Sequence, residues 1–210
     1  MEVDCKSLLQ EEFVGTDSTV RASQTLRQRI QDLWFLACEA NCTKLVKTLY
    51  PWMVTNINCC NDPGYSALGI AADYGHLELA QLLLSWSGVE INAVANNCCR
   101  LYTALHVACR KNHLHITKLL LSRCDILVNT QARNIDDSDN FLSVTPLELA
   151  CSYGSLDCVL LLLQDRRTDL YCNNCLFLSL LVANDVSDTV WDRIFEINGQ
   201  ILSLFGLRFD

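Results

Sequence analysis

The sequence predicts an all-α solenoid of about five stacked helix-turn-helix repeats, joined by finger hairpins and closed by degenerate end copies. Three observations predict this fold class: one template recurs three times, an alanine marks each copy, and an apolar helical segment follows each alanine. The 210 residues are 50% hydrophobic and 19% charged, which permits a buried core and argues against global disorder.

The three clear copies begin at Ser66, Thr103 and Thr145. Each reads as a small hydroxyl residue, any residue, leucine, any residue, an apolar residue, alanine and a small residue. The anchor alanines are Ala71, Ala108 and Ala150, spaced 37 and 42 residues apart. This pattern resembles the ankyrin repeat, which has a period of about 33 residues and a T-P-L-H-x-A core. The longer spacings here predict lengthened fingers.

Two degenerate copies flank the clear ones. Ala37 lies 34 residues before Ala71, and Ala183 lies 33 residues after Ala150. Terminal repeats of a solenoid are expected to be atypical, because one of their faces meets solvent. The resemblance therefore covers residues 27–198. We expect residues 1–26 to form a mostly flexible arm and the apolar residues 199–210 to pack on the last repeat, or else to act as a short docking peptide.

Helix starts are predicted by capping residues. Ser66, Thr103 and Thr145 stand where a side-chain oxygen accepts a bond from a free backbone N–H, and Asp32 fills this place in the first copy. Thr145 and Glu148 have the spacing of a capping box.

Two recurrent positions predict the core. Cys38, Cys109 and Cys151 directly follow an anchor alanine, where a thiol serves as a small apolar group. The positions eight residues after the anchors are Leu45, Leu79, Ile116, Cys158 and Trp191. This stripe belongs to the second helix of each copy, and no copy can bury it alone, so stability must come from stacking.

The charge and the N-terminal sequence exclude several classes of partner. A net charge of −8 argues against binding to nucleic acid or to an anionic membrane, which require clustered basic residues. The N-terminus shows no secretory signal, so we expect a cytoplasmic or nuclear protein in which the 13 cysteines are mostly free thiols. We also expect a monomer without a small-molecule substrate.

No motif for catalysis, a cofactor or a metal stands out. The pairs Cys59-Cys60 and Cys98-Cys99 and the motif Cys172-x-x-Cys175 leave a zinc site or redox sensing open as a minor alternative. His76, His106 and His113 occupy repeat positions, which favours structural roles. No phosphate loop, nucleophile elbow or H-E-x-x-H pattern occurs, so we do not expect an enzyme.

The resemblance implies a concave groove built from finger tips and inner helices. The residues of this sequence at those positions include Tyr65, Asp73, Tyr74, Arg100, Tyr102, Arg110, Lys111, Phe141 and Tyr153. Aromatic residues would flank a basic centre of Arg100, Arg110 and Lys111, which suits an acidic or phosphorylated segment of a partner. The alternative is that some of these tyrosines only pack between fingers.

The predicted function is a non-catalytic adaptor or scaffold that binds a partner protein or peptide in this groove. The alternative is a substrate-recognition subunit of a ubiquitin ligase. The C-terminal residues lack the Leu-Pro-rich ending expected of an adaptor-binding box, which weakens this alternative.

Overall fold

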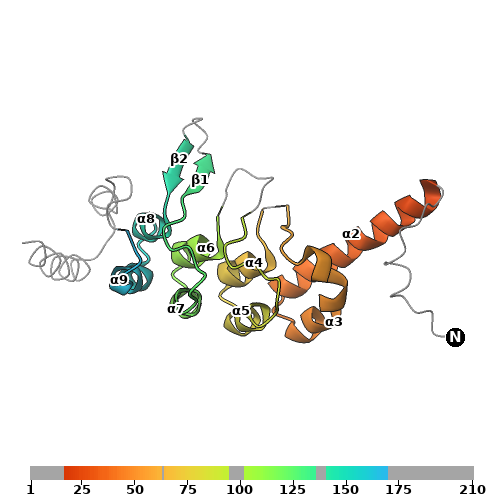
Figure 1. Cartoon of the computed structure of the whole chain (residues 1–210), viewed down its shortest axis with the longest axis horizontal. Helices are drawn as coiled ribbons and strands as arrows, with labels where there is room; N and C mark the ends of the chain where they lie inside the picture. The colour runs from red at the N-terminus through yellow and green to blue at the C-terminus, as the bar shows by residue number, and fades with distance from the viewer. Residues whose placement is uncertain (1–16, 63, 95–101, 136–140, 170–210) are drawn as a thin grey trace, which may run out of the picture.

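The computed structural model describes residues 17–62, 64–94, 102–135 and 141–169 (Figure 1). Four helix pairs occupy these residues: α2 Asp17–Glu39 with α3 Thr43–Met53, α4 Ala67–Tyr74 with α5 Leu77–Leu84, α6 Ala104–Arg110 with α7 Leu114–Leu121, and α8 Pro146–Ser152 with α9 Leu156–Gln164. A short 3-10 helix, η1 Val54–Asn56, follows α3. The predicted all-α repeat solenoid is confirmed.

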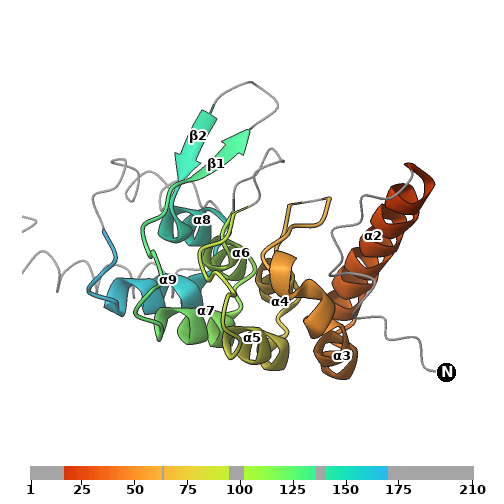
Figure 2. The ribbon, with the colours of Figure 1, turned by 45° about the vertical axis from the view of Figure 1, so that its right-hand side comes forward.

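The helices form two rows along the stack. The inner helices α4, α6 and α8 pack side by side, and α3, α5, α7 and α9 form the outer row (Figures 1 and 2). α2 opens the inner row and projects beyond it (Figure 1). The four pairs correspond to the first four predicted copies, while the fifth, around Ala183, lies outside the described residues, as do residues 1–16 and the C-terminal segment 199–210.

The predicted caps start the inner helices. Oγ of Ser66 accepts a hydrogen bond from the N–H of Gly69 at 3.2 Å. Thr103 and Thr145 each form a reciprocal capping box, with His106 and Glu148 respectively. These bonds satisfy N–H groups that have no partner within the helix, which fixes where each helix begins.

The first helix corrects two predictions. α2 begins at Asp17, so the arm boundary expected at residue 26 falls inside a helix. Asp32 does not cap a helix but lies within α2, where its Oδ1 accepts a hydrogen bond from Gln28 at 2.9 Å. Residues 17–31 contain no glycine or proline and include several strong helix formers, so nothing stops the helix before Asp32.

The core lies between consecutive copies. The anchor alanines and the cysteines that follow them are buried, as predicted. Cys158, eight residues after its anchor, has its Sγ 3.3 Å from Oγ1 of Thr117 in the preceding copy. This position therefore faces the preceding copy. Leu45, its equivalent in the first copy, is only half-buried because no described copy precedes it.

A second recurrent contact joins the copies. Nε2 of His76 donates to the carbonyl of Glu39 at 2.9 Å, and Nε2 of His113 donates to the carbonyl of Asp73 at 3.2 Å. In the fourth copy Ser155 occupies the same position, and its Oγ donates to the carbonyl of Arg110 at 3.3 Å. The structural roles predicted for the two histidines are thus confirmed.

The fingers rise from the inner row. β1 Ala132–Ile135 and β2 Phe141–Val144 form an antiparallel hairpin in which Ala132 pairs with Val144. This hairpin is the lengthened finger predicted before the fourth copy (Figure 2).

A series of asparagines that the sequence analysis missed connects the loops beneath the fingers. Asn58, Asn92 and Asn129 each use both ends of the amide to bond the backbone of the next copy. Asn92, for example, donates to the carbonyl of Asp125 at 2.8 Å and accepts from the N–H of Leu127 at 2.9 Å. The irregular spacing of the three asparagines hid this series from the search for a fixed period.

Candidate functional site

One row of exposed side chains crosses the inner helices. Tyr74, Lys111 and Tyr153 stand three residues after their anchors, at the last residue of α4 and at the C-caps of α6 and α8. Both tyrosine rings are exposed. Because α4, α6 and α8 pack side by side, these three equivalent positions lie along one face of the stack. We call these three residues the inner-helix row.

Arg110 lies beneath this row in a cluster of polar and aromatic groups. Its Nη2 donates to the hydroxyl of Tyr65 at 3.0 Å and to Oδ1 of Asp73 at 2.9 Å. Its guanidinium carbon also lies 5.6 Å from the ring centroid of Tyr102, within the range of a cation–π contact. The cluster links α6 to α4, since Asp73 belongs to the preceding copy.

The charge of this cluster corrects the prediction of a strongly basic centre. Burial alone would lower the pKa of Arg110, but the interactions with Tyr65 and Asp73 outweigh it, and the pKa is raised. The Arg110 side chain is only 10% exposed, whereas Lys111 is 44% exposed with its Nζ 3.5 Å from the same Asp73 oxygen. One carboxylate thus faces two cations, which leaves a single net positive charge on these three residues.

The placement of Tyr102 is a second correction. Its ring is only 4% exposed and stacks on the His106 ring, with centroids 5.8 Å apart and planes 11° from parallel. It therefore supports Arg110 from below and offers no area to a partner. This outcome matches the alternative that some of the tyrosines pack inside the repeat.

Two other predicted site residues receive no side-chain placement. Arg100 lies outside the described residues. Phe141 begins β2 and its backbone pairs with Ile135, so its position in the finger is known. The inner-helix row and the Arg110 cluster are the parts of the predicted site that the structure brings together.

His106 is fully buried beside the site and has the structural role predicted for it. Its Nδ1 accepts from the Thr103 backbone at 3.3 Å, and its Nε2 donates to the Val144 carbonyl at 3.2 Å. Burial lowers the pKa of His106 to about 4, so the ring is neutral at physiological pH. The neutral ring joins α6 to the base of the next finger.

The described cysteines are free, and several are inert. Burial raises the pKa of Cys38 to about 12 and that of Cys151 also to about 12, so both remain protonated thiols at neutral pH. No three histidine, cysteine or acidic side chains gather into a metal site within the described ranges. Cys98, Cys99, Cys172 and Cys175 lie outside those ranges.

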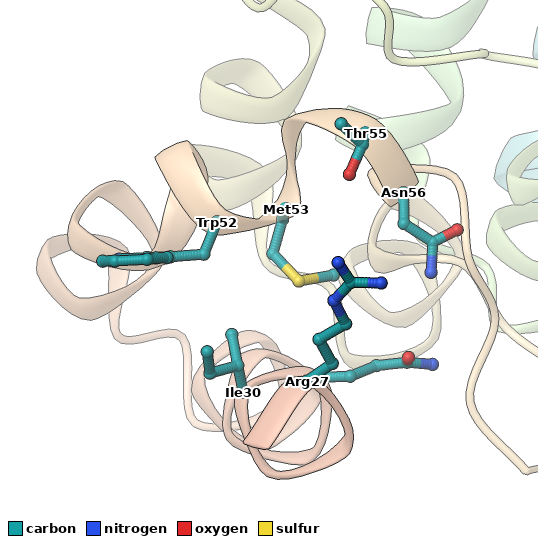
Figure 3. Close-up of a pocket in the computed structure, with 7 residues that line it drawn as sticks. Arg27, Ile30, Trp52, Met53, Thr55 and Asn56 are labelled. Atoms are coloured by element: carbon teal, nitrogen blue, oxygen red, sulfur yellow. The ribbon is translucent and has the colours of Figure 1, made fainter. Parts of the chain in front are cut away.

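A cavity of about 360 Å³ lies at the other end of the described stack. It is lined by Arg27, Ile30 and Gln31 of α2, Trp52 and Met53 of α3, and Thr55 and Asn56 of η1 (Figure 3). No carboxylate, histidine or cysteine is among these lining residues, so the cavity lacks the groups for acid–base or metal chemistry. The sequence analysis missed it because α2 and η1 were not expected to meet.

Among the helices in the described part of the chain, none combines the length and apolarity that a bilayer span requires.

Comparison with known proteins agrees with the repeat architecture. A family model described as ankyrin repeats (3 copies) matches residues 33–131 and 96–174. No curated protein sequence matches the chain. The matched ranges together cover more than half of the 210 residues and run through the helix pairs described above. The chain therefore belongs to the ankyrin-repeat family.

Proposed function

We propose that this chain is a non-catalytic adaptor or scaffold that captures a segment of a partner protein on its inner-helix face. Ankyrin repeats are generally protein–protein interaction modules, and the inner-helix row carries the proposal for this chain. Tyr74 and Tyr153 are exposed although the core has room for aromatic rings elsewhere, and Lys111 stands between them. Tyrosine supplies large contact area with little loss of side-chain entropy on binding.

The charge of the row favours an acidic segment. Asp73 offsets one of the two cations, and Lys111 is the more accessible of the two. A carboxylate or phosphate on the partner would meet Lys111, while apolar side chains would lie against the tyrosine rings on either side. Arg110 would hold its neighbours in place and would not itself contact the partner.

The proposal is tested with one exposed charge reversal and a matched control. Lys111→Glu removes the accessible positive charge of the row, whereas Lys118→Glu reverses an exposed lysine on the outer helix α7. We expect quantitative affinity capture from cell extract to lose its specific partners with Lys111→Glu and to keep them with Lys118→Glu. The wild-type interaction should also weaken with salt, because it depends on exposed charges.

Folding must be checked in the same experiment. Both lysines are exposed, so each variant should unfold within about 0.5 kcal/mol of wild type. A folded Lys111→Glu variant that retains every partner would remove the inner-helix row from the account. The ubiquitin-ligase alternative has no described feature in its favour, and we do not propose it.

A further inference from the structure

The outward face of α2 carries three exposed leucines. Leu26, Leu33 and Leu36 are among the most exposed large apolar side chains in the described residues. Their separations of seven and three residues place them on one side of a helix with 3.6 residues per turn. Arg29 falls on the same side, between Leu26 and Leu33. We call these four residues the α2 stripe.

Repeat register shows what such a face normally contacts. Leu33 and Leu36 stand four residues and one residue before the anchor Ala37. The equivalent residues in the later copies are Ala67, Ala104 and Pro146, and Ile70, Val107 and Leu149. All six are buried, on the side of each inner helix that receives the preceding copy. The α2 stripe is thus a stacking surface with no described helix upon it.

The stripe is complementary in charge to itself. Arg29 has no ion-pair partner among the described residues, and Asp32 lies one turn away on the flank of the stripe, exposed, with Gln28 as its printed hydrogen-bond donor. If two copies of α2 lie antiparallel, Leu26 of each faces Leu36 of the other and Arg29 faces Leu33. The stem of Arg29 then covers that leucine while its guanidinium reaches Asp32 of the second copy.

A two-fold axis makes each of these contacts twice, which is the arrangement that closed dimers use. α2 has 23 residues, the longest described helix, and at 1.5 Å per residue it extends for roughly 34 Å. It projects beyond the rest of the stack (Figure 1), so a second copy could lie along it without meeting the fingers.

We propose that the chain forms a two-fold dimer through antiparallel pairing of the α2 stripe. This dimer replaces the monomer expected from the sequence. It leaves both inner-helix rows free, since they lie on α4, α6 and α8. The particle would therefore present two copies of that surface, and a partner carrying two binding segments would gain avidity from the second engagement. The dimer stands or falls independently of the function proposed above.

The test is the mass of the full chain in solution, measured by sedimentation equilibrium across micromolar concentrations. We expect twice the 23.7 kDa chain mass for wild type. Leu36→Lys should give the mass of a single chain. Leu127→Lys is the matched control, because Leu127 is 59% exposed and Leu36 is 60% exposed, and this variant should remain dimeric. Circular dichroism should show that all three proteins are folded.

A charge exchange tests the pairing itself. Arg29→Asp and Asp32→Arg should each weaken the dimer at least tenfold, and the double variant Arg29→Asp/Asp32→Arg should restore it, since the exchanged charges again face each other across the axis. The exposed Arg29→Asp variant also serves if Leu36→Lys fails to fold. A single-chain mass for wild type, a dimer that survives Leu36→Lys, or a double variant weaker than both single ones would each overturn the proposal.

Discussion

At the scale of single residues, Arg110 and Lys111 are neighbours in sequence with different roles. Arg110 is nearly buried and bonds Tyr65 and Asp73, both of the preceding copy, whereas Lys111 reaches solvent. Sequence reasoning placed both in one basic binding centre. The structure assigns Arg110 to stacking between copies and leaves Lys111 as the accessible charge, because the guanidinium can satisfy several acceptors at once and the ammonium cannot.

This division predicts different effects on stability. Arg110→Met should lower the free energy of unfolding by about 1–3 kcal/mol, because it leaves a half-buried carboxylate and a phenol without their donor. Lys111→Met should stay within about 0.5 kcal/mol of wild type. Urea unfolding followed by circular dichroism measures both values. Equal losses in the two variants would show that Arg110 does not join the copies as described.

The buried histidine predicts a pH dependence. The pKa of His106 is about 4 in the folded chain against 6.5 for an ordinary histidine, so between these values the unfolded chain binds a proton that the folded chain does not. Stability should therefore fall as the pH falls from 6.5 to 4, by up to about 1.4 kcal/mol per pH unit from this residue. Above pH 6.5 His106 adds no pH dependence.

The contribution of His106 is isolated by comparison with His106→Gln. This variant removes the titrating ring and should lose stability less steeply than wild type over the same pH range, whatever its stability at pH 6.5. Urea unfolding at steps from pH 6.5 to 4 gives the two slopes. Parallel slopes would mean that His106 can be protonated in the folded chain.

At the scale of the helix pair, the sequence predicted elements with strong local signals. Thr103 and Thr145 mark helix starts because their side chains bond the first free N–H groups, and this effect needs no tertiary contact. The start of α2 was missed for the opposite reason. Asp32 is an acceptable cap by residue type, but the helix formers before it extend the helix to Asp17.

Features that depend on packing between copies were harder to predict. Tyr102 occupies a finger position that is exposed in an idealised repeat, yet here its ring is enclosed by His106 and Arg110. The bonds of Asn58, Asn92 and Asn129 depend on where the next loop passes, which irregular repeat lengths obscure. By contrast, Tyr74 and Tyr153 follow from register alone, and their exposure agrees with the prediction.

The register of the inner helices predicts the cost of truncating a leucine. Leu105 is fully buried between its cap Thr103 and its anchor Ala108, so Leu105→Ala should destabilise the chain by about 2–5 kcal/mol. Leu127→Ala, at an exposed position, should cost no more than about 0.5 kcal/mol. The midpoint and slope of urea unfolding give both values, and a loss below the control for Leu105→Ala would place the register in error.

At the scale of the whole molecule, stacking builds a surface that no single copy has. Each helix pair contributes one residue to the inner-helix row, and the side-by-side packing of α4, α6 and α8 brings Tyr74, Lys111 and Tyr153 onto one face. Contacts from His113 to Asp73 and from Ser155 to Arg110 hold the copies in this alignment. A partner segment that runs along the stack would meet the three side chains in turn.

The central claim is that partners bind on the inner-helix row, and site-specific photo-crosslinking tests it most directly. A photoreactive phenylalanine analogue is placed at position 74, 111 or 153, and at position 118 on the outer helix as the control. We predict that partner proteins crosslink at the three row positions and not at position 118. Crosslinks that form at position 118, with none at the row, would contradict the account and assign binding to the outer helices.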